Sequence, residues 1–117
     1  MDDIVKNNLV SIGRLLEEHS CENTLVLDIS GHNSWTEGFI IATVTSQGHL
    51  RGVVRHIREA LDERKIPIYH GSKNIEEEGW TLVDCGDFII HLMNRETRDF
   101  YELEKLWHFG TVLDYSR

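Results

Sequence analysis

Two carboxylates, Asp84 and Asp87, flank the dipeptide Cys85–Gly86 and are close enough in sequence to be considered as ligands of a divalent metal. A nucleotidyltransferase needs carboxylates that hold a divalent metal against triphosphate oxygens, together with a Gly-Ser turn that cradles phosphate. Here the acids straddle a turn instead of alternating along one strand, and an acidic segment follows Gly71–Ser72. An enzyme acting on nucleotides, with Ser46, Asp84 and Asp87 around a metal, is therefore the alternative function. No catalytic residue, metal or cofactor is assigned.

Other residues of reactive type fit structural roles better. His49 and His56 are seven positions apart on a predicted helix, whereas helical metal ligands are usually four apart, and no third ligand is identifiable. Asp28 ends a short apolar run, where an acid is either a catalytic carboxylate or a hydrogen-bond acceptor for the following turn. We expect it to hydrogen-bond the Ser30–Gly31 turn, because strand-end aspartates commonly do so.

Length, charge and cysteine content limit the function classes. The 117 residues fit a single domain, residues 1–117, that buries one core. The net charge of −8 argues against direct sequence-specific nucleic-acid binding and favours a basic protein as partner. Two cysteines without paired spacing are typical of a reduced, cytoplasmic protein. No apolar run reaches transmembrane length, so no membrane association is expected.

A β-hairpin over residues 80–93 must position the acidic pair. Gly86 can supply a positive φ angle, so Cys85–Gly86 is predicted to be a two-residue loop. In that register Asp84 lies opposite Asp87, and Trp80 lies opposite His91. Alternation then places seven residues on one face: Trp80, Leu82, Asp84, Asp87, Ile89, His91 and Met93. Such a mixed face is typical of a partner surface, although its polar residues could equally flank a solvated turn or be ordinary covered residues.

The remaining elements follow from hydrophobic periodicity. It predicts a first helix ending near residue 20, strands at 24–29 and 39–44, a helix capped by Ser46, and a strand at 65–69. After the hairpin, Asn94 is predicted to cap a last helix whose apolar stripe packs on the sheet: Phe100, Leu103, Leu106 and Trp107. This order predicts an α/β fold with a mixed sheet of about five strands flanked by helices.

The hairpin and last helix together resemble a family signature. The run Trp80-x-Leu-Val-Asp-x-Gly-Asp-x-Ile-Ile-His-Leu-Met, followed by Arg98-Asp-Phe-Tyr-Glu-Leu-Glu-Lys-Leu-Trp107, is similar to that of the iojap-like ribosomal silencing factors. Upstream, the Thr36-x-x-Phe-Ile-Ile-Ala-Thr stretch and Ser46-x-x-His49 also fit the family pattern. Two features depart from the family pattern. Glu37 stands where the family usually carries Asp after this threonine, and the acidic run at 76–78 is long.

The resemblance implies a nucleotidyltransferase-like topology without catalysis. It implies a protein that binds the large ribosomal subunit through its ribosomal protein fourteen, blocks association with the small subunit and represses translation under nutrient limitation. A role in large-subunit biogenesis is also implied. Carried onto this sequence, the partner-binding residues are Trp80, Leu82, Asp84, Asp87, His91 and Met93, with Arg98, Tyr101 and Glu104 from the helix. A homodimer that uses the same sheet edge is a third hypothesis.

Overall fold

One five-stranded sheet organises the structure. The computed structural model describes residues 1–32, 34–69 and 79–115. Their elements, in chain order, are α1 (Asp3–Glu18), β1 (Glu22–Asp28), β2 (Gly38–Thr43), α2 (Gln47–Glu63), β3 (Trp80–Asp84), β4 (Phe88–Met93), α3 (Arg95–Tyr101), α4 (Leu103–Leu106) and β5 (Thr111–Val112). The strand order is β3-β4-β2-β1-β5, with β2 and β4 parallel and every other neighbouring pair antiparallel. The predicted mixed sheet of about five strands is confirmed.

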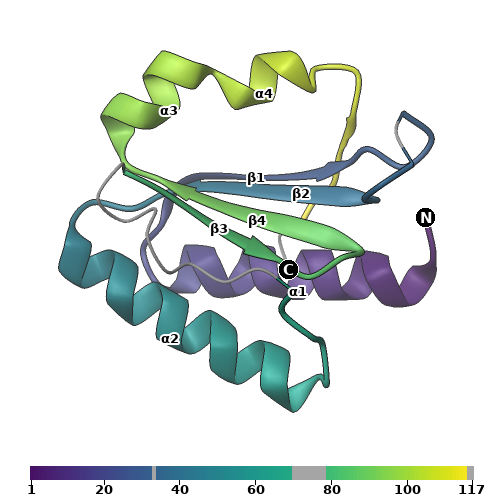
Figure 1. The fold of residues 1–117 in the computed structure, drawn as a ribbon, viewed down its shortest axis with the longest axis horizontal. Helices are drawn as coiled ribbons and strands as arrows, with labels where there is room; N and C mark the ends of the chain where they lie inside the picture. Colours follow the sequence, from purple (N-terminus) through teal and green to yellow (C-terminus); the bar gives the residue numbers. More distant parts are fainter. Residues whose placement is uncertain (33, 70–78, 116–117) are drawn as a thin grey trace.

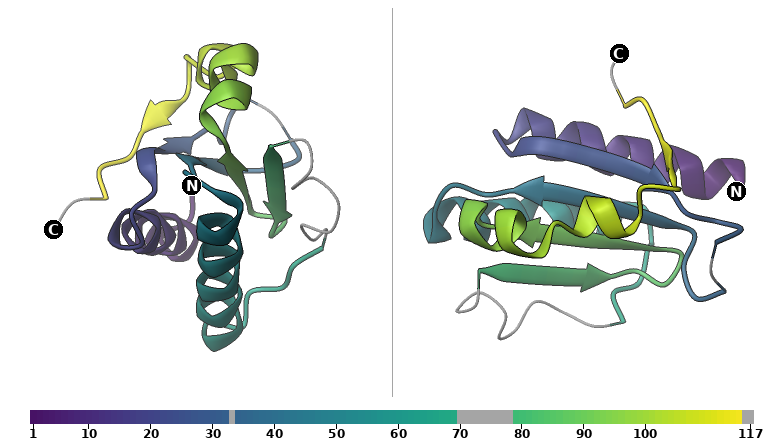
Figure 2. Two further views of the ribbon diagram at one scale, coloured as in Figure 1. Left: turned by 90° about the vertical axis from the view of Figure 1, so that its left-hand side faces the viewer. Right: turned by 90° about the horizontal axis from the view of Figure 1, so that it is seen from above.

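Helices cover both faces of this sheet. α1 and α2 lie against one face, and α3 and α4 lie across the other (Figure 1). Figure 2 shows α1 and α2 side by side beneath the sheet when it is seen from its end. Each face therefore has its own apolar core. The first core, under α1 and α2, includes Leu9, Ile12, Leu16, Ile40, Ile57, Leu61, Ile90 and Leu92. The second core, under α3 and α4, includes Leu27, Ile29, Phe39, Ile41, Ile89, Met93 and Leu103.

Local capping explains where the helices begin. Asp2 Oδ1 accepts a hydrogen bond from the Ile4 N–H at 2.6 Å at the start of α1. Ser46 Oγ accepts from the His49 N–H at 3.0 Å, and Asn94 Oδ1 accepts from the Thr97 N–H at 2.8 Å. Side-chain oxygens at these positions satisfy N–H groups that have no partner within the helix. The predicted caps Ser46 and Asn94 are confirmed.

The predicted last helix is divided, and its predicted stripe is partly wrong. Glu102 adopts a left-handed backbone (φ 46°, ψ 48°) that separates α3 from α4. Leu103 is buried, but Phe100 is 79% exposed and Leu106 is 66% exposed. The reason is that α3 turns Arg98 toward the sheet, and a residue two positions further along a helix does not share that face. The apolar side chain of Phe100 therefore points into solvent.

The fifth strand is not the predicted one. Residues 65–69 form no strand, although the Tyr69 N–H donates to the Asp84 carbonyl at 2.8 Å. Lys65 has a positive φ of 58° and Pro67 has no N–H, so this segment cannot continue a ladder. The short β5 on the other edge completes the sheet instead. Gly71–Ser72 and the acidic residues 76–78 lie outside the described residues. Across the described residues, no helix combines the length and apolar character that crossing a bilayer requires.

The hairpin register differs from the predicted one by two residues. Trp80 pairs with Met93, Leu82 with His91, and Asp84 with Ile89. The chain reverses at Gly86 and the residue after it, because Gly86 has a φ of +80° and its N–H donates to Asp84 Oδ1 at 2.8 Å. The two predicted oppositions, Asp84 to Asp87 and Trp80 to His91, are therefore wrong. The loop is thus Gly86–Asp87 and not the predicted Cys85–Gly86, but a shift of two leaves the side chains of β3 and β4 on their predicted faces.

Candidate partner-binding surface

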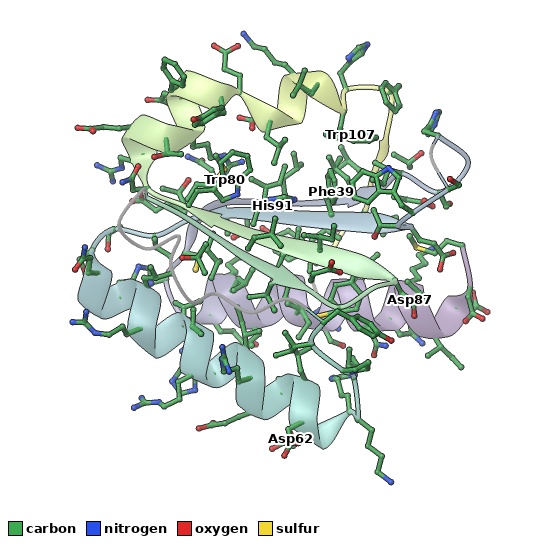
Figure 3. The ribbon with its side chains drawn as sticks, in the orientation of Figure 1. Phe39, Asp62, Trp80, Asp87, His91 and Trp107 are labelled. Carbon is green, nitrogen blue, oxygen red and sulfur yellow. The ribbon has the colours of Figure 1, made fainter. Side chains whose placement is uncertain are left out.

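The mixed face of the hairpin is covered by α3 and α4. Trp80, His91, Phe39 and Trp107 lie in the layer between these helices and the sheet (Figure 3). Met93 is fully buried, and His91 and Arg98 are less than a tenth exposed, so these three predicted contact residues lie beneath the surface of this structure. The physical reason is that the last helix folds back over this face. The side chains that reach the surface are Trp80, Leu82, Asp84, Asp87, Tyr101 and Glu104.

Trp80 is fixed by its contact with His91. The indole Nε1–H donates to His91 Nδ1 at 3.1 Å, and the two ring centroids are 5.8 Å apart. Because Nδ1 accepts, the proton of the neutral imidazole is on Nε2, which has no hydrogen-bond partner among the described residues. Phe39 meets the imidazole edge-on at 4.7 Å. Burial lowers the pKa of His91 to about 4, so the ring is neutral at pH 7.

This histidine should make stability depend on pH. Its pKa falls from 6.5 to about 4 on folding, so at intermediate pH the unfolded chain binds a proton that the folded chain does not. The free energy of unfolding should therefore fall as the pH decreases below 6.5, by about 2 kcal/mol at pH 5 from this residue. Urea unfolding of the wild type and of His91→Gln at pH 7 and pH 5 measures it. A decline of equal size in both proteins would contradict the assignment.

Arg98 and Glu104 tie the two short helices to the sheet. Arg98 Nη1 donates to Thr43 Oγ1 at 3.1 Å, and both side chains are buried. Arg98 Nε lies 3.6 Å from Glu104 Oε1, across the left-handed residue Glu102. Guanidinium and carboxylate therefore hold α3 and α4 in one arrangement over β2. Arg98 is a structural residue, while Glu104, whose side chain is 35% exposed, also reaches the surface.

An aromatic group continues the surface from Trp80 onto α3. The ring centroids of Trp80 and Tyr101 are 5.1 Å apart, and those of Tyr101 and Phe100 are 5.0 Å apart. Tyr101 is 52% exposed. Phe100 was missed as a surface residue because its spacing fits an apolar stripe. We call the group Trp80, Leu82, Asp84, Asp87, Phe100 and Tyr101 the hairpin surface.

The residues of the alternative enzyme do not come together. β2 and β4 are parallel, with Gly38 beside Phe88 and Thr43 beside Met93. Ser46 therefore follows one end of this pair and Asp87 precedes the other, about 20 Å away for a strand of this length. Grouping Ser46 with Asp84 and Asp87 is wrong. Within the described part of the chain, no three His, Cys, Asp or Glu side chains are placed to hold a metal ion.

The other reactive residue types have structural contacts. His49 Nε2 lies 2.7 Å from the His19 carbonyl, and the His56 ring stacks on the His19 ring at 4.0 Å. Asp28 Oδ1 accepts from the Ser30 N–H at 2.9 Å, which confirms its predicted turn role. Burial raises the pKa of Cys85 to about 12, with Asp84 and Asp87 adding to the effect. This thiol is therefore protonated and not a nucleophile at neutral pH.

A second aromatic group, absent from the predicted site, lies at the turn end of the hairpin. His32 and Phe109 have ring centroids 4.6 Å apart, and Trp107 lies 5.5 Å from Phe109. Trp35 lies 6.0 Å from Trp107 and is 57% exposed. An indole in the polar loop after β1 was the sequence signal that could have indicated a surface here. The end of this loop is joined to the hairpin turn, because the Glu37 N–H donates to the Asp87 carbonyl at 2.9 Å.

Comparison with known proteins identifies the family. A family model described as "Ribosomal silencing factor during starvation" matches residues 3–116. The chain is 31% identical over 98 residues to ribosomal silencing factor RsfS of Bacillus subtilis (strain 168), covering 84% of this chain and 82% of that protein. It is 33% identical over 92 residues to ribosomal silencing factor RsfS of Chromobacterium violaceum, covering 79% of this chain and 75% of that protein.

Two further likenesses agree with this match. The chain is 33% identical over 95 residues to "Mitochondrial assembly of ribosomal large subunit protein 1" of Mus musculus, covering 80% of this chain but 42% of that protein. A crystal structure of a protein from Chromobacterium violaceum has a TM-score of 0.78 to this fold at 26% identity, covering 100% of this chain and 94% of that chain. The description of the family model names a silencing factor, which is a regulatory role. This chain therefore belongs to the ribosomal silencing factor family.

Proposed function

We propose that this protein binds the large ribosomal subunit through its ribosomal protein fourteen and prevents association with the small subunit. Translation is thereby repressed when nutrients are limiting. The observation that carries the proposal is the family match over residues 3–116, which spans every element of the fold. The protein acts in the cytoplasm as a single domain and not as an enzyme. A role in large-subunit biogenesis is part of the proposal, since the mouse relative is named for assembly of that subunit.

The hairpin surface supplies the contact in this proposal. Trp80 is half-buried, with its indole N–H held by His91 and one side against Tyr101. A large aromatic side chain held in one orientation loses little freedom on binding, and tryptophan and tyrosine are enriched among residues that dominate interface energies. Asp84 and Asp87 add negative charge at the turn. We infer that Trp80 is the anchor and that Tyr101 and Phe100 extend it.

Charge supports a basic partner. The chain carries 20 acidic residues against 12 Lys and Arg. Ribosomal proteins are typically basic, so opposite potentials bring the two surfaces together and orient them, an effect on association rate more than on affinity. A homodimer that uses the same sheet edge stays a prediction, which the sedimentation of the purified protein tests.

The test is a subunit-joining assay with purified ribosomal subunits. Trp80→Ala should weaken binding to large subunits by about 2 kcal/mol, roughly thirtyfold, and should restore joining at concentrations where the wild type blocks it. Ile4→Ala is the control, because Ile4 is 71% exposed on α1, beneath the opposite face of the sheet. Circular dichroism at the assay temperature establishes that both variants are folded. A folded Trp80→Ala protein that still blocks joining would remove Trp80 from the site.

A further inference from the structure

A pocket lies where the hairpin turn meets the loop after β1. We call it the Trp35 pocket and define it by Ser30, Trp35, Glu37, Gly86 and Asp87. Its cavity volume is about 330 Å³, enough for a long side chain but small for a drug-sized ligand. It lies at the opposite end of the hairpin from Trp80, which begins β3. The pocket is therefore separate from the anchor of the hairpin surface.

Backbone hydrogen bonds join Ile29 and Glu37, at the two ends of the loop after β1, to each other and to the hairpin turn. The Glu37 N–H donates to the Asp87 carbonyl, and the Ile29 N–H donates to the Glu37 carbonyl, both at 2.9 Å. The Trp35 ring meets Trp107 nearly edge-on at 6.0 Å and lies 5.8 Å from Phe39. Those ring contacts orient the indole, and Trp35 is still 57% exposed, so an aromatic side chain held in place is accessible at this pocket.

The charge of the pocket has one sign. Residues 28–37 and 84–87 include four carboxylates and no Lys or Arg. Two of the carboxylates have partners, since Asp28 accepts from Ser30 and Asp84 accepts from the Gly86 N–H. Among residues 1–32, 34–69 and 79–115, the carboxylates of Glu37 and Asp87 have no hydrogen-bond or ion-pair partner. Two acids that are not neutralised therefore stand beside an exposed indole.

We propose that the Trp35 pocket receives a lysine or arginine side chain of the basic protein partner. The face of a tryptophan ring attracts a cation, and carboxylates complete its coordination by charge-assisted hydrogen bonds. The proposal rests on the proposed function only for the identity of the protein that carries the cation. It assigns two residues, Trp35 and Glu37, that the sequence signature of the hairpin and helix does not include. It also gives Asp87 a specific role.

The first test needs no ribosome. Nα-acetyl-arginine amide is titrated into the ¹⁵N-labelled protein while the indole N–H of Trp35 and the backbone N–H of Glu37 are followed by NMR. Saturable shifts at both positions are expected, and both should be lost in Glu37→Gln/Asp87→Asn. In Trp35→Leu, whose leucine can still pack against Phe39, the shift of the Glu37 backbone N–H should be reduced. Absence of saturable shifts would overturn the proposal. Magnesium chloride that produced the same saturable shifts would also overturn it, in favour of a metal site.

The second test measures affinity for purified large subunits. Glu37→Gln/Asp87→Asn should weaken binding roughly tenfold, about the effect of losing one close charge pair. Asp62→Asn/Glu63→Gln is the matched control, because it removes two exposed charges from the far end of α2 (Figure 3). The control should bind within about twofold of wild type, since the loss of distant surface charge affects only steering.

The outcomes separate the two proposals. If wild type does not bind subunits, the proposed function fails, while the arginine titration still decides whether the pocket binds a cation. If wild type binds and Glu37→Gln/Asp87→Asn binds equally well, the pocket proposal fails and the proposed function stands. If the pocket variant and the charge control weaken binding equally, net charge is the cause, and the pocket proposal also fails.

Discussion

Phe39→Ala is expected to lower the free energy of unfolding by about 3–5 kcal/mol, because the substitution leaves a cavity in the second core. Phe39 is 2% exposed. Its ring lies 4.7 Å from His91, 5.0 Å from Trp107 and 5.8 Å from Trp35. The neighbours that would have to collapse into the space are aromatic rings with contacts of their own, so little relaxation is available. Urea denaturation at pH 7 measures the change.

The same substitution at an exposed phenylalanine is the control. Phe100 is 79% exposed on α3, and Phe100→Ala should change the free energy of unfolding by less than about 0.5 kcal/mol. The comparison uses the same substitution at a buried position in β2 and at an exposed position in α3. Equal losses at the two positions would show that α3 packs differently from the arrangement in the structure. That outcome would also withdraw Phe100 from the hairpin surface.

Gly79→Ala is the second substitution with a large expected effect, a loss of about 3 kcal/mol. Gly79 has a φ of +75°, a left-handed conformation that costs a residue with a Cβ about 1–2 kcal/mol. A Cβ there would also collide with the Asn94 side-chain amide and lie 2.6 Å from Thr97 Oγ1. Since Asn94 caps α3, displacing it should cost about 1 kcal/mol more. Thermal melting and urea denaturation measure the change.

Gly52→Ala provides a control of opposite sign. Gly52 lies inside α2, and a Cβ at this position would have no atom within 4 Å outside its own helix backbone and chain neighbours. Alanine stabilises a helix relative to glycine by about 0.5–1 kcal/mol, so this variant should melt at a higher temperature. If Gly79→Ala also raised the melting temperature, Asn94 could not be held as the structure places it.

The parts of the fold that were predictable from the sequence depend on short-range patterns. Ser46 and Asn94 were predicted as caps because a cap is decided by residues within one turn of the helix. The two faces of the hairpin were predicted because alternation survives a shift of two. The register of the hairpin was not predicted, because it depends on the turn. In that turn Gly86 has a positive φ and its N–H donates to Asp84 Oδ1.

The candidate site was harder to predict, because it depends on what covers the sheet. The alternating pattern of β4 is the same whether the face that carries His91 and Met93 is exposed or covered. These residues are buried because α3 and α4 fold back across that face. The apolar period of the last helix indicated Phe100 as core, but buried hydrogen bonding by Arg98 set the rotation of α3. Trp35 was missed because a single aromatic residue in a loop belongs to no repeating hydrophobic pattern.

The parallel pair of β2 and β4 has a consequence for how the chain acquires this fold. β1 and β2 are close in sequence, as are β3 and β4, so each antiparallel pair closes only a short loop. Pairing β2 with β4, with Gly38 beside Phe88 and Thr43 beside Met93, closes a much longer loop of chain. Contacts between residues so far apart in sequence slow folding. During synthesis, β2 therefore emerges with one edge unpaired and waits for β4. Until then the nascent chain presents an open strand edge, which is a site for wrong pairing between chains.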